Sequence, residues 1–219
     1  MKIKKPLRKT TNKKECIVIN PDVKYYYNPY GGISDDELLE IIEPKHSIQE
    51  WIAQLNQKPP IIIQLVGKKG RGKTTHLRVL HQLLTNPEIY FLNITNKEVN
   101  ISKKNSQILI DSIHHIPIRK RFQLWRKSEV SYVITTHWKR NIEFFLCKRK
   151  FKTYHFNGIA LNKLENIIKK RVSLSSSLEY EDIEINTELL QKLHAKYGDN
   201  IRGILNYLYD NLKVDNYGN

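Results

Sequence analysis

One ten-residue segment limits the fold more strongly than any other part of the chain. GKKGRGKTTH begins at Gly67, directly after the apolar run IIIQLV (61–66), and its last residues open a helical pattern. A short apolar run of this kind is typical of a strand that is buried on both faces, which favours a parallel sheet covered by helices. The positions that satisfy G-x-x-x-x-G-K-[ST], in the strand and helix context that the pattern requires, are Gly67, Gly72, Lys73 and Thr74.

The chemistry of this loop predicts a bound nucleotide. Glycines allow the backbone to curl so that successive N–H groups point at phosphate oxygens, and the start of the following helix adds a partial positive charge. In such loops the lysine reaches the β and γ phosphates of ATP and the hydroxyl holds Mg²⁺, which assigns these roles to Lys73 and Thr74. The three other cations of the loop, Lys68, Lys69 and Arg71, either strengthen the positive field around the phosphates or face solvent. The expected nucleotide-binding residues of the loop are Gly67, Lys68, Lys69, Gly70, Arg71, Gly72, Lys73, Thr74 and Thr75.

A carboxylate at the tip of another buried strand is needed to orient the water shell of the metal. The segment QILID (107–111) supplies Asp111, whose alternative role is to cap the next helix. The next residue is Ser112, which cannot accept a proton from an attacking water at neutral pH. We therefore expect Mg²⁺ on Thr74 and Asp111 and slow hydrolysis of ATP, unless Glu98 or a partner chain supplies the base.

Strands and helices alternate between residues 61 and 160, which implies a parallel sheet with crossover helices. The link 95–106 between the second and third strands is polar and too short for a comfortable crossover helix. Two further helices are predicted before the sheet, and the first opens with a capping box formed by Ser34 and Glu37. The five expected strands cover 61–66, 89–94, 107–111, 131–137 and 153–159.

After residue 160 the pattern is purely helical. We expect the α/β domain to cover 25–160 and a small all-helical lid domain to cover 161–219, where it packs on the sheet or caps its ligand. Residues 1–24 carry many lysines and few core-forming residues, which predicts a flexible basic arm. The fold class is therefore α/β, with a parallel five-stranded sheet flanked by helices and a C-terminal helical lid.

The formal charge of +15 makes a nucleic acid the first candidate partner, because such a field attracts polyanions. Part of this charge is compositional, since lysine, asparagine and isoleucine are all abundant. The segment IRKRFQLWRK (118–127) concentrates cations around Phe122 and Trp125, for which we favour a place in the core over base stacking. Contacts to phosphate backbones predict weak sequence preference and strong salt dependence. The expected nucleic-acid-binding residues are Arg119, Lys120, Arg121, Arg126 and Lys127.

Other features of the sequence exclude several classes of protein and site. No run approaches the roughly 20 apolar residues of a membrane span, and no apolar segment follows the basic start, so we expect a soluble cytoplasmic protein. Cys16 and Cys147 lie too far apart in the sequence to suggest a disulfide framework or a metal-ligand pair. His114 and His115 are adjacent and would point apart on a regular element, so we expect no metal there.

The motifs together resemble those of AAA+ ATPases. The loop has the tighter form G-x-x-G-x-G-K-T, which resembles their Walker A motif, and ILID (108–111) is similar to their Walker B motif. YGDNIRGILNYL (197–208) resembles the sensor 2 helix of the initiator-like clade, which includes origin-recognition and bacterial initiator ATPases and the ATPase regulators of Tn7-type transposition. The resemblance covers roughly residues 25–212. It implies ATP and Mg²⁺ as cofactors and self-association that depends on nucleotide.

The resemblance also implies roles for single residues. Arg202 falls on the sensor arginine that reaches the nucleotide from the lid, and Tyr30 lies in the NPY stretch that flanks adenine. Thr136, or next Thr135, matches the polar sensor at the end of the fourth strand. Arg149, with Arg140 as second choice, is the candidate that completes a neighbour's site in an oligomer; the alternative is an exposed basic helix end.

Two departures limit what the resemblance implies. Ser112 replaces the usual glutamate, which removes the family's catalytic base, and the short link after the second strand removes most of a helix that carries pore or DNA contacts. The leading hypothesis is an ATP-dependent switch that binds nucleic acid. The alternatives are a nucleotide-gated scaffold for a protein partner, with ATP held rather than hydrolysed, and a small phosphotransferase.

Overall fold

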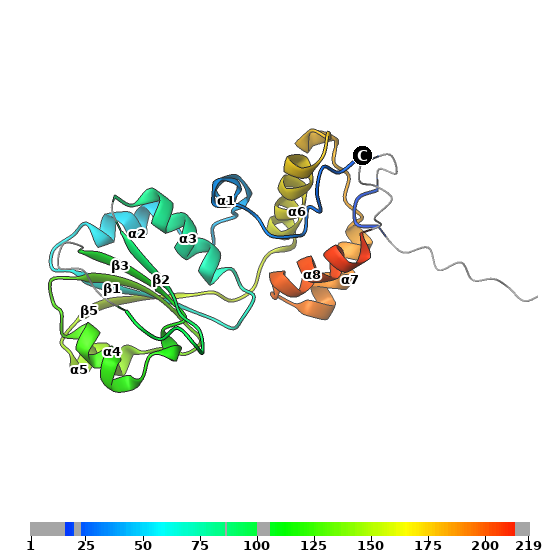
Figure 1. Ribbon diagram of the computed structural model, residues 1–219. Coiled ribbons are helices and arrows are strands. Elements are labelled where there is room, and N and C mark those ends of the chain that lie inside the picture. Colours follow the sequence, from blue (N-terminus) through cyan, green and yellow to red (C-terminus); the bar gives the residue numbers. More distant parts are fainter. Residues whose placement is uncertain (1–15, 20–22, 86, 100–105, 213–219) are drawn as a thin grey trace, which may run out of the picture.

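The computed structural model describes residues 16–19, 23–85, 87–99 and 106–212. Its centre is one sheet of five parallel strands in the order β2-β3-β4-β1-β5 (Figure 1). The strands are β1 (Ile61–Val66), β2 (Glu88–Phe91), β3 (Gln107–Asp111), β4 (Ser131–Thr136) and β5 (Lys150–His155). The predicted parallel five-stranded sheet flanked by helices is confirmed.

The pattern of side chains along the strands explains their places in the sheet. All residues of β1 and β4 are buried, as expected for central strands, and Val66 pairs with Thr136 and with His155 at the carboxyl edge. The fifth strand begins at Lys150, three residues before the predicted start at residue 153. In this edge strand, lysines alternate with half-buried or buried side chains, so charge concealed its beginning.

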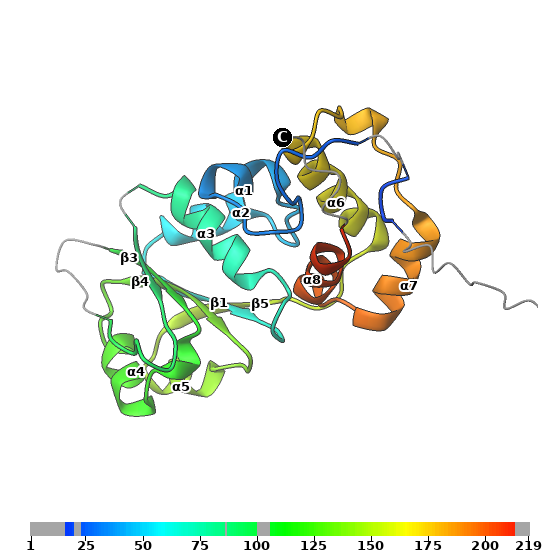
Figure 2. The same cartoon turned by 45° about the vertical axis from the view of Figure 1, so that its right-hand side comes forward.

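Helices cover both faces of the sheet (Figure 2). One face packs against α2 (Ile48–Leu55) and α3 (Lys73–Leu83), where Trp51 and Leu77 are fully buried. The other face packs against α4 (Ile118–Trp125) and α5 (Asn141–Leu146). No helix follows β2 in residues 92–99, and the remainder of the link, 100–105, lies outside the described residues.

The C-terminal helices form a separate core beside the carboxyl end of the sheet. They are α6 (Leu161–Ser175), α7 (Thr187–Tyr197) and α8 (Ile201–Asn211). Helix α1 (Asp35–Ile41) lies between this core and α3, and it begins with the predicted capping box of Ser34 and Glu37. In the described part of the chain, no helix is long and apolar enough to cross a membrane.

The N-terminal segment does not behave as a flexible arm where the structure describes it. Ile17, Val18 and Val23 are buried against the C-terminal helices, and Val18 forms an antiparallel bridge with Ile185. Burial of Ile17, Val18 and Val23 therefore outweighs their basic surroundings, and the predicted flexible arm over 1–24 is wrong for these residues. Residues 1–15 and 20–22 of that prediction lie outside the described residues.

A buried ion pair joins α4 to α5. Arg121 and Glu143 form two hydrogen bonds, of 3.0 and 2.7 Å, and Trp125 Nε1 also donates to Glu143 at 3.0 Å. The remaining guanidinium nitrogen, Arg121 Nη1, donates to the carbonyl of Ile116 at 2.6 Å. Burial would raise the pKa of Glu143, but the bonds from Arg121 and Trp125 and the charge of Arg121 outweigh it, so this pKa is lowered.

The substitution Glu143→Gln should destabilise the fold, because it leaves the Arg121 charge buried without its partner. Loss of one member of such a pair costs about 3–5 kcal/mol. Since the folded-state pKa of Glu143 is below its unfolded value near 4.3, the wild type should lose this contribution as pH falls through the folded-state pKa, and the variant should lack that part of the acid dependence. Urea unfolding between neutral and acidic pH measures both effects. Glu188→Gln, at an exposed pair with Lys192, is the control that should leave stability unchanged.

Candidate functional site

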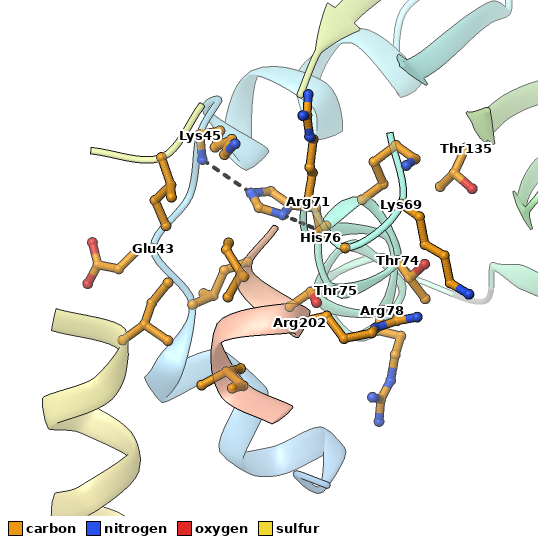
Figure 3. Close-up of a pocket in the computed structure, with 18 of the residues that line it drawn as sticks. Glu43, Lys45, Lys69, Arg71, Thr74, Thr75, His76, Arg78, Thr135 and Arg202 are labelled. Carbon is orange, nitrogen blue, oxygen red and sulfur yellow. Dashed lines mark hydrogen bonds between the residues drawn. The ribbon is translucent and has the colours of Figure 1, made fainter. Parts of the chain in front are cut away.

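A cavity of about 1190 Å³ lies at the carboxyl end of the strands, where ligands bind in open α/β sheets. Its walls come from the glycine-rich loop between β1 and α3, the ends of β3 and β4, the segments around residues 30–33 and 41–46, and α8. Lys69, Thr74, Thr75 and Arg202 are among the side chains around it (Figure 3). The cavity therefore collects residues from both halves of the chain.

The glycines of the loop are required by its shape. Gly70 and Gly72 both have φ of 81°, a left-handed conformation that other residues adopt at a cost. Gly67 is not left-handed, but an added Cβ would lie 2.5 Å from the carbonyl oxygen of Phe156. The loop can therefore curl as predicted only with glycine at these three positions.

The amino group of Lys73 lies in the centre of the loop. It donates hydrogen bonds to the carbonyls of Gly67 at 2.7 Å and Lys68 at 2.8 Å. Burial lowers the pKa of Lys73 to about 8; Asp111 opposes this shift, and the cations Arg71 and Arg202 add to it. An anion bound in the loop would stabilise the charged form of Lys73, so the loop is electrostatically suited to a phosphate.

Asp111 connects the loop to the two neighbouring strand ends. Its Oδ1 accepts hydrogen bonds from Thr74 Oγ1 at 2.9 Å and from Thr135 Oγ1 at 2.7 Å. Thr135 Oγ1 in turn accepts from the backbone N–H of Ser112 at 2.7 Å. The structure thus brings Thr74 and Asp111 together as predicted. Carboxylate and hydroxyl oxygens are ligands that Mg²⁺ prefers, so this pair fits that metal.

The two threonines at the end of β4 have different contacts. Thr135 contacts Asp111, whereas the hydroxyl of Thr136 donates to the carbonyl of Trp138 at 3.0 Å and supports the turn after the strand. Both residues line the cavity. The structure therefore places Thr135, the second choice from the sequence, against the acidic residue.

A second part of the cavity lining comes from one core cluster around Tyr30, which we call the apolar end. Tyr30, which the resemblance places beside adenine, is buried and lines the cavity. The guanidinium of Arg171, from α6, donates to the carbonyls of Pro29 at 2.8 Å and Gly31 at 3.1 Å, and it fixes this segment. Nothing in the sequence pattern had indicated Arg171. The apolar residues at this end are Ile33, Ile41, Ile159, Ile167 and Leu205.

The start of α8 touches the glycine-rich loop directly. The backbone N–H of Arg202 donates to the Gly70 carbonyl at 3.4 Å, and the Arg202 side chain lines the cavity. Asp199 forms an ion pair with Arg71 and accepts from the N–H of Gly158 at 2.6 Å. Asn200 caps α8 and leaves no space for a Cβ on Gly70. Sequence reasoning found Arg202 but missed Asp199 and Asn200.

His76, in the first turns of α3, is a second residue that the sequence did not reveal. Its Nδ1 lies 2.8 Å from the Gly72 carbonyl, and its Nε2 accepts from the N–H of Lys45 at 3.2 Å (Figure 3). Burial lowers the pKa of His76 to about 4, so the ring is neutral near pH 7, with its proton on Nδ1. The neutral ring ties the loop to the segment around Lys45.

Arg149 does not have the geometry of a residue that reaches a neighbouring chain. It is 7% exposed, and its guanidinium donates to the carbonyls of Trp125, Lys127 and Val130 at 3.0, 2.7 and 2.5 Å. It also lies over the ring of Tyr132. These contacts hold the turn after α4, so the prediction of an intersubunit role for Arg149 does not fit the structure.

The basic helix is divided by its own amphipathic pattern. Arg121 is buried in the pair with Glu143, so the prediction that it binds nucleic acid is wrong. Trp125 is fully buried, as favoured from the sequence, and Phe122 is half-buried. None of these residues lines the large cavity. The exposed cations that remain on α4 and just after it are Arg119, Lys120, Arg126 and Lys127.

His114 and His115 both line the cavity, and their ring centroids lie 4.3 Å apart. The expectation that they point apart is therefore wrong. They lie in a short 3₁₀ turn (Ile113–His115) and not in a long regular helix or strand, so the geometry of a regular element does not apply to them.

No family model matches this chain, and no curated protein matches it.

Proposed function

We propose that the protein binds ATP with Mg²⁺ in the large cavity and acts as a nucleotide-dependent switch that associates with nucleic acid. The observation that carries this proposal is the lining of one cavity, which includes both the cationic, glycine-rich loop and the apolar cluster around Tyr30. A nucleotide has the same two parts, since its phosphates are anionic and its base is flat and largely apolar. The motif resemblance to AAA+ ATPases of the initiator-like clade supports the same function.

Each part of the nucleotide has matching residues. Lys73 and the N–H groups of the loop suit the phosphates, and Arg202 adds a cation from α8. Thr74 and Asp111 would hold Mg²⁺, which supplies charge neutralisation of the phosphates when it is bound. The apolar end beside Tyr30 suits the base.

We propose that the C-terminal helices are the part of the switch that moves when a nucleotide binds. The loop and α8 are joined through Arg71, Asp199 and Asn200, so a triphosphate in the loop must adjust contacts with the C-terminal helices. A ligand shifts a conformational equilibrium only if it binds one state more tightly. Arg202 provides such a difference, because its distance from the phosphates depends on where α8 lies. Closure of these helices would then promote self-association.

We propose that hydrolysis is slow. Ser112 follows Asp111, and its hydroxyl lies 3.3 Å from the Asp111 carboxylate without any capacity to take a proton near neutral pH. Glu98, considered from the sequence as another base, is exposed and does not line the large cavity. ATP is thus held for longer than in an efficient ATPase.

A second function, a nucleotide-gated scaffold for a protein partner, is favoured by one observation. Trp138 is 69% exposed and Phe145 is 77% exposed, and Ile142 and Leu146 are exposed beside Phe145 on α5. Large apolar side chains gathered in this way are common at protein interfaces. A small phosphotransferase is the least favoured alternative, because the helical part follows the sheet instead of interrupting it.

Lys73→Ala should abolish measurable ATP binding, since it removes the ammonium group that lies at the centre of the loop. We expect a loss of affinity of at least about 100-fold, which corresponds to about 2.7 kcal/mol. Calorimetric titration with ATP and Mg²⁺ measures it. Lys58→Ala, at an exposed lysine before β1, is the matched control and should bind as the wild type does. Retained affinity in Lys73→Ala would refute the assignment of the loop.

Replacement of Arg119, Lys120, Arg126 and Lys127 by glutamine should weaken nucleic-acid binding and flatten its dependence on salt. Each phosphate contact that is lost lowers the slope of log K against log[salt] by roughly 0.7–0.9. Fluorescence anisotropy with labelled DNA, at several salt concentrations and with and without ATP, measures the slope. The charge-matched control replaces the exposed lysines Lys24, Lys58, Lys192 and Lys196. An equal effect in both variants would show that net charge, rather than this helix, binds the DNA.

A further inference from the structure

Three imidazole rings meet at the phosphate end of the cavity. His114 and His115 come from the 3₁₀ turn after β3, and His137 comes from the residue after β4. The ring centroid of His114 lies 4.3 Å from that of His115 and 4.8 Å from that of His137. All three line the cavity beside Asp111 and Ser112. We call these residues the histidine cluster.

Of the three histidines, His137 follows the strand end that pairs with Val66, the residue before the glycine-rich loop. It follows Thr136, whose carbonyl accepts a hydrogen bond from the Gly67 N–H at 3.2 Å, and its ring interacts electrostatically with Lys73 and Asp111. The Gly67 carbonyl accepts the 2.7 Å bond from Lys73 Nζ. The imidazole is therefore near the ammonium that is expected to meet the terminal phosphate.

The His137 ring can accept a proton in its neutral form. Burial and Lys73 lower the pKa of the ring more than the backbone of Gly67 raises it. In a neutral imidazole the second nitrogen is a proton acceptor. Burial, and next the charge of Lys73, lower the pKa of His137, so the neutral form prevails near pH 7. His114 packs edge-on against this ring and limits its rotation.

A carboxylate could also accept a proton from a water molecule in the cavity, but both carboxylates among the described residues that line it are bonded to other side chains. Only Glu43 and Asp111 are acidic there. Asp111 already accepts from two threonine hydroxyls, and Glu43 pairs with Lys170 at 2.6 Å on α6, toward the apolar end. The histidine cluster thus supplies the unclaimed proton acceptors near the loop.

We propose that His137 accepts the proton of the water that attacks the terminal phosphate, in place of the carboxylate that Ser112 does not supply. This inference rests on the proposed binding of ATP. The water oxygen forms a bond to the terminal phosphorus, the bond from that phosphorus to the bridging oxygen breaks, and the water proton moves to the free nitrogen of His137. The products are ADP and inorganic phosphate. His114 is a positioning residue that orients the His137 ring.

The test compares His137→Ala and His137→Gln with the wild type. Phosphate release at saturating ATP and the dissociation constant for ATP are measured separately, and folding is checked by thermal unfolding. General bases contribute about 100- to 10,000-fold, so both variants should release phosphate at least about 100-fold more slowly while they bind ATP normally. Added imidazole should partly restore the rate of His137→Ala, which a purely structural role would not allow. His81→Ala, on α3 outside the cavity, is the control.

The outcomes separate this inference from the proposed function. An unchanged rate in a folded His137 variant, or a slow rate that imidazole does not restore, would overturn the role of His137. Wild-type protein that binds ATP but releases no phosphate would also overturn it and leave ATP binding intact. Wild-type protein that does not bind ATP would refute the proposed function, and the inference with it. If His137→Ala does not fold, His137→Gln, which keeps a polar side chain at this position, decides the question alone.

Discussion

The carboxylate of Asp111 connects the three elements on which the cavity depends. One oxygen accepts from Thr74 at the start of α3 and from Thr135 at the end of β4. Because β4 lies between β1 and β3, the loop after β1 and the acid after β3 can meet only across the end of β4. The loop reaches the acid directly through Thr74, and Thr135 on β4 adds a second hydrogen bond to the same oxygen. The loop, the acid and the histidine cluster take their positions from this arrangement.

The central fold follows from local properties of the sequence. The run at 61–66, the glycines of the loop and the capping box at Ser34 each depend on neighbouring residues, and the structure agrees with them. The meeting of Thr74 and Asp111 was predictable as well, since the carboxyl ends of parallel strands share an edge. Local patterns were thus sufficient for the sheet and for the core of the candidate site.

Most of the errors have a common physical cause, because they depend on a partner far away in the sequence. Arg121 reads as a solvated cation until Glu143, on the next helix, is beside it. Arg149 was assigned to a neighbour's site, but it satisfies three carbonyls of its own chain. Ile17 and Val18 needed the C-terminal core to become buried. Asp199, Asn200 and His76 were missed for the same reason.

Because Arg121 and Arg149 are buried, fewer cations remain on the surface for contact with a nucleic acid. The field of a +15 chain remains, but the candidates for nucleic-acid contact are reduced to exposed cations. The apolar residues of α5 lie on the same side of the sheet as α4, so a protein partner and a polyanion would approach one face of the molecule (Figure 1). A nucleotide bound at the loop, together with the contacts between the loop and α8, would influence that face only indirectly.

The central claim is that one nucleotide engages both the glycine-rich loop and the C-terminal helices. Hydrogen exchange measured by mass spectrometry, with and without ATP and Mg²⁺, tests it most directly. If one nucleotide engages both parts, ATP should slow amide exchange in residues 67–75 and, in the same experiment, in residues 199–205 at the start of α8. Exchange that stays unchanged in the loop at saturating ATP would contradict the account, as would protection of the loop with no change in α8.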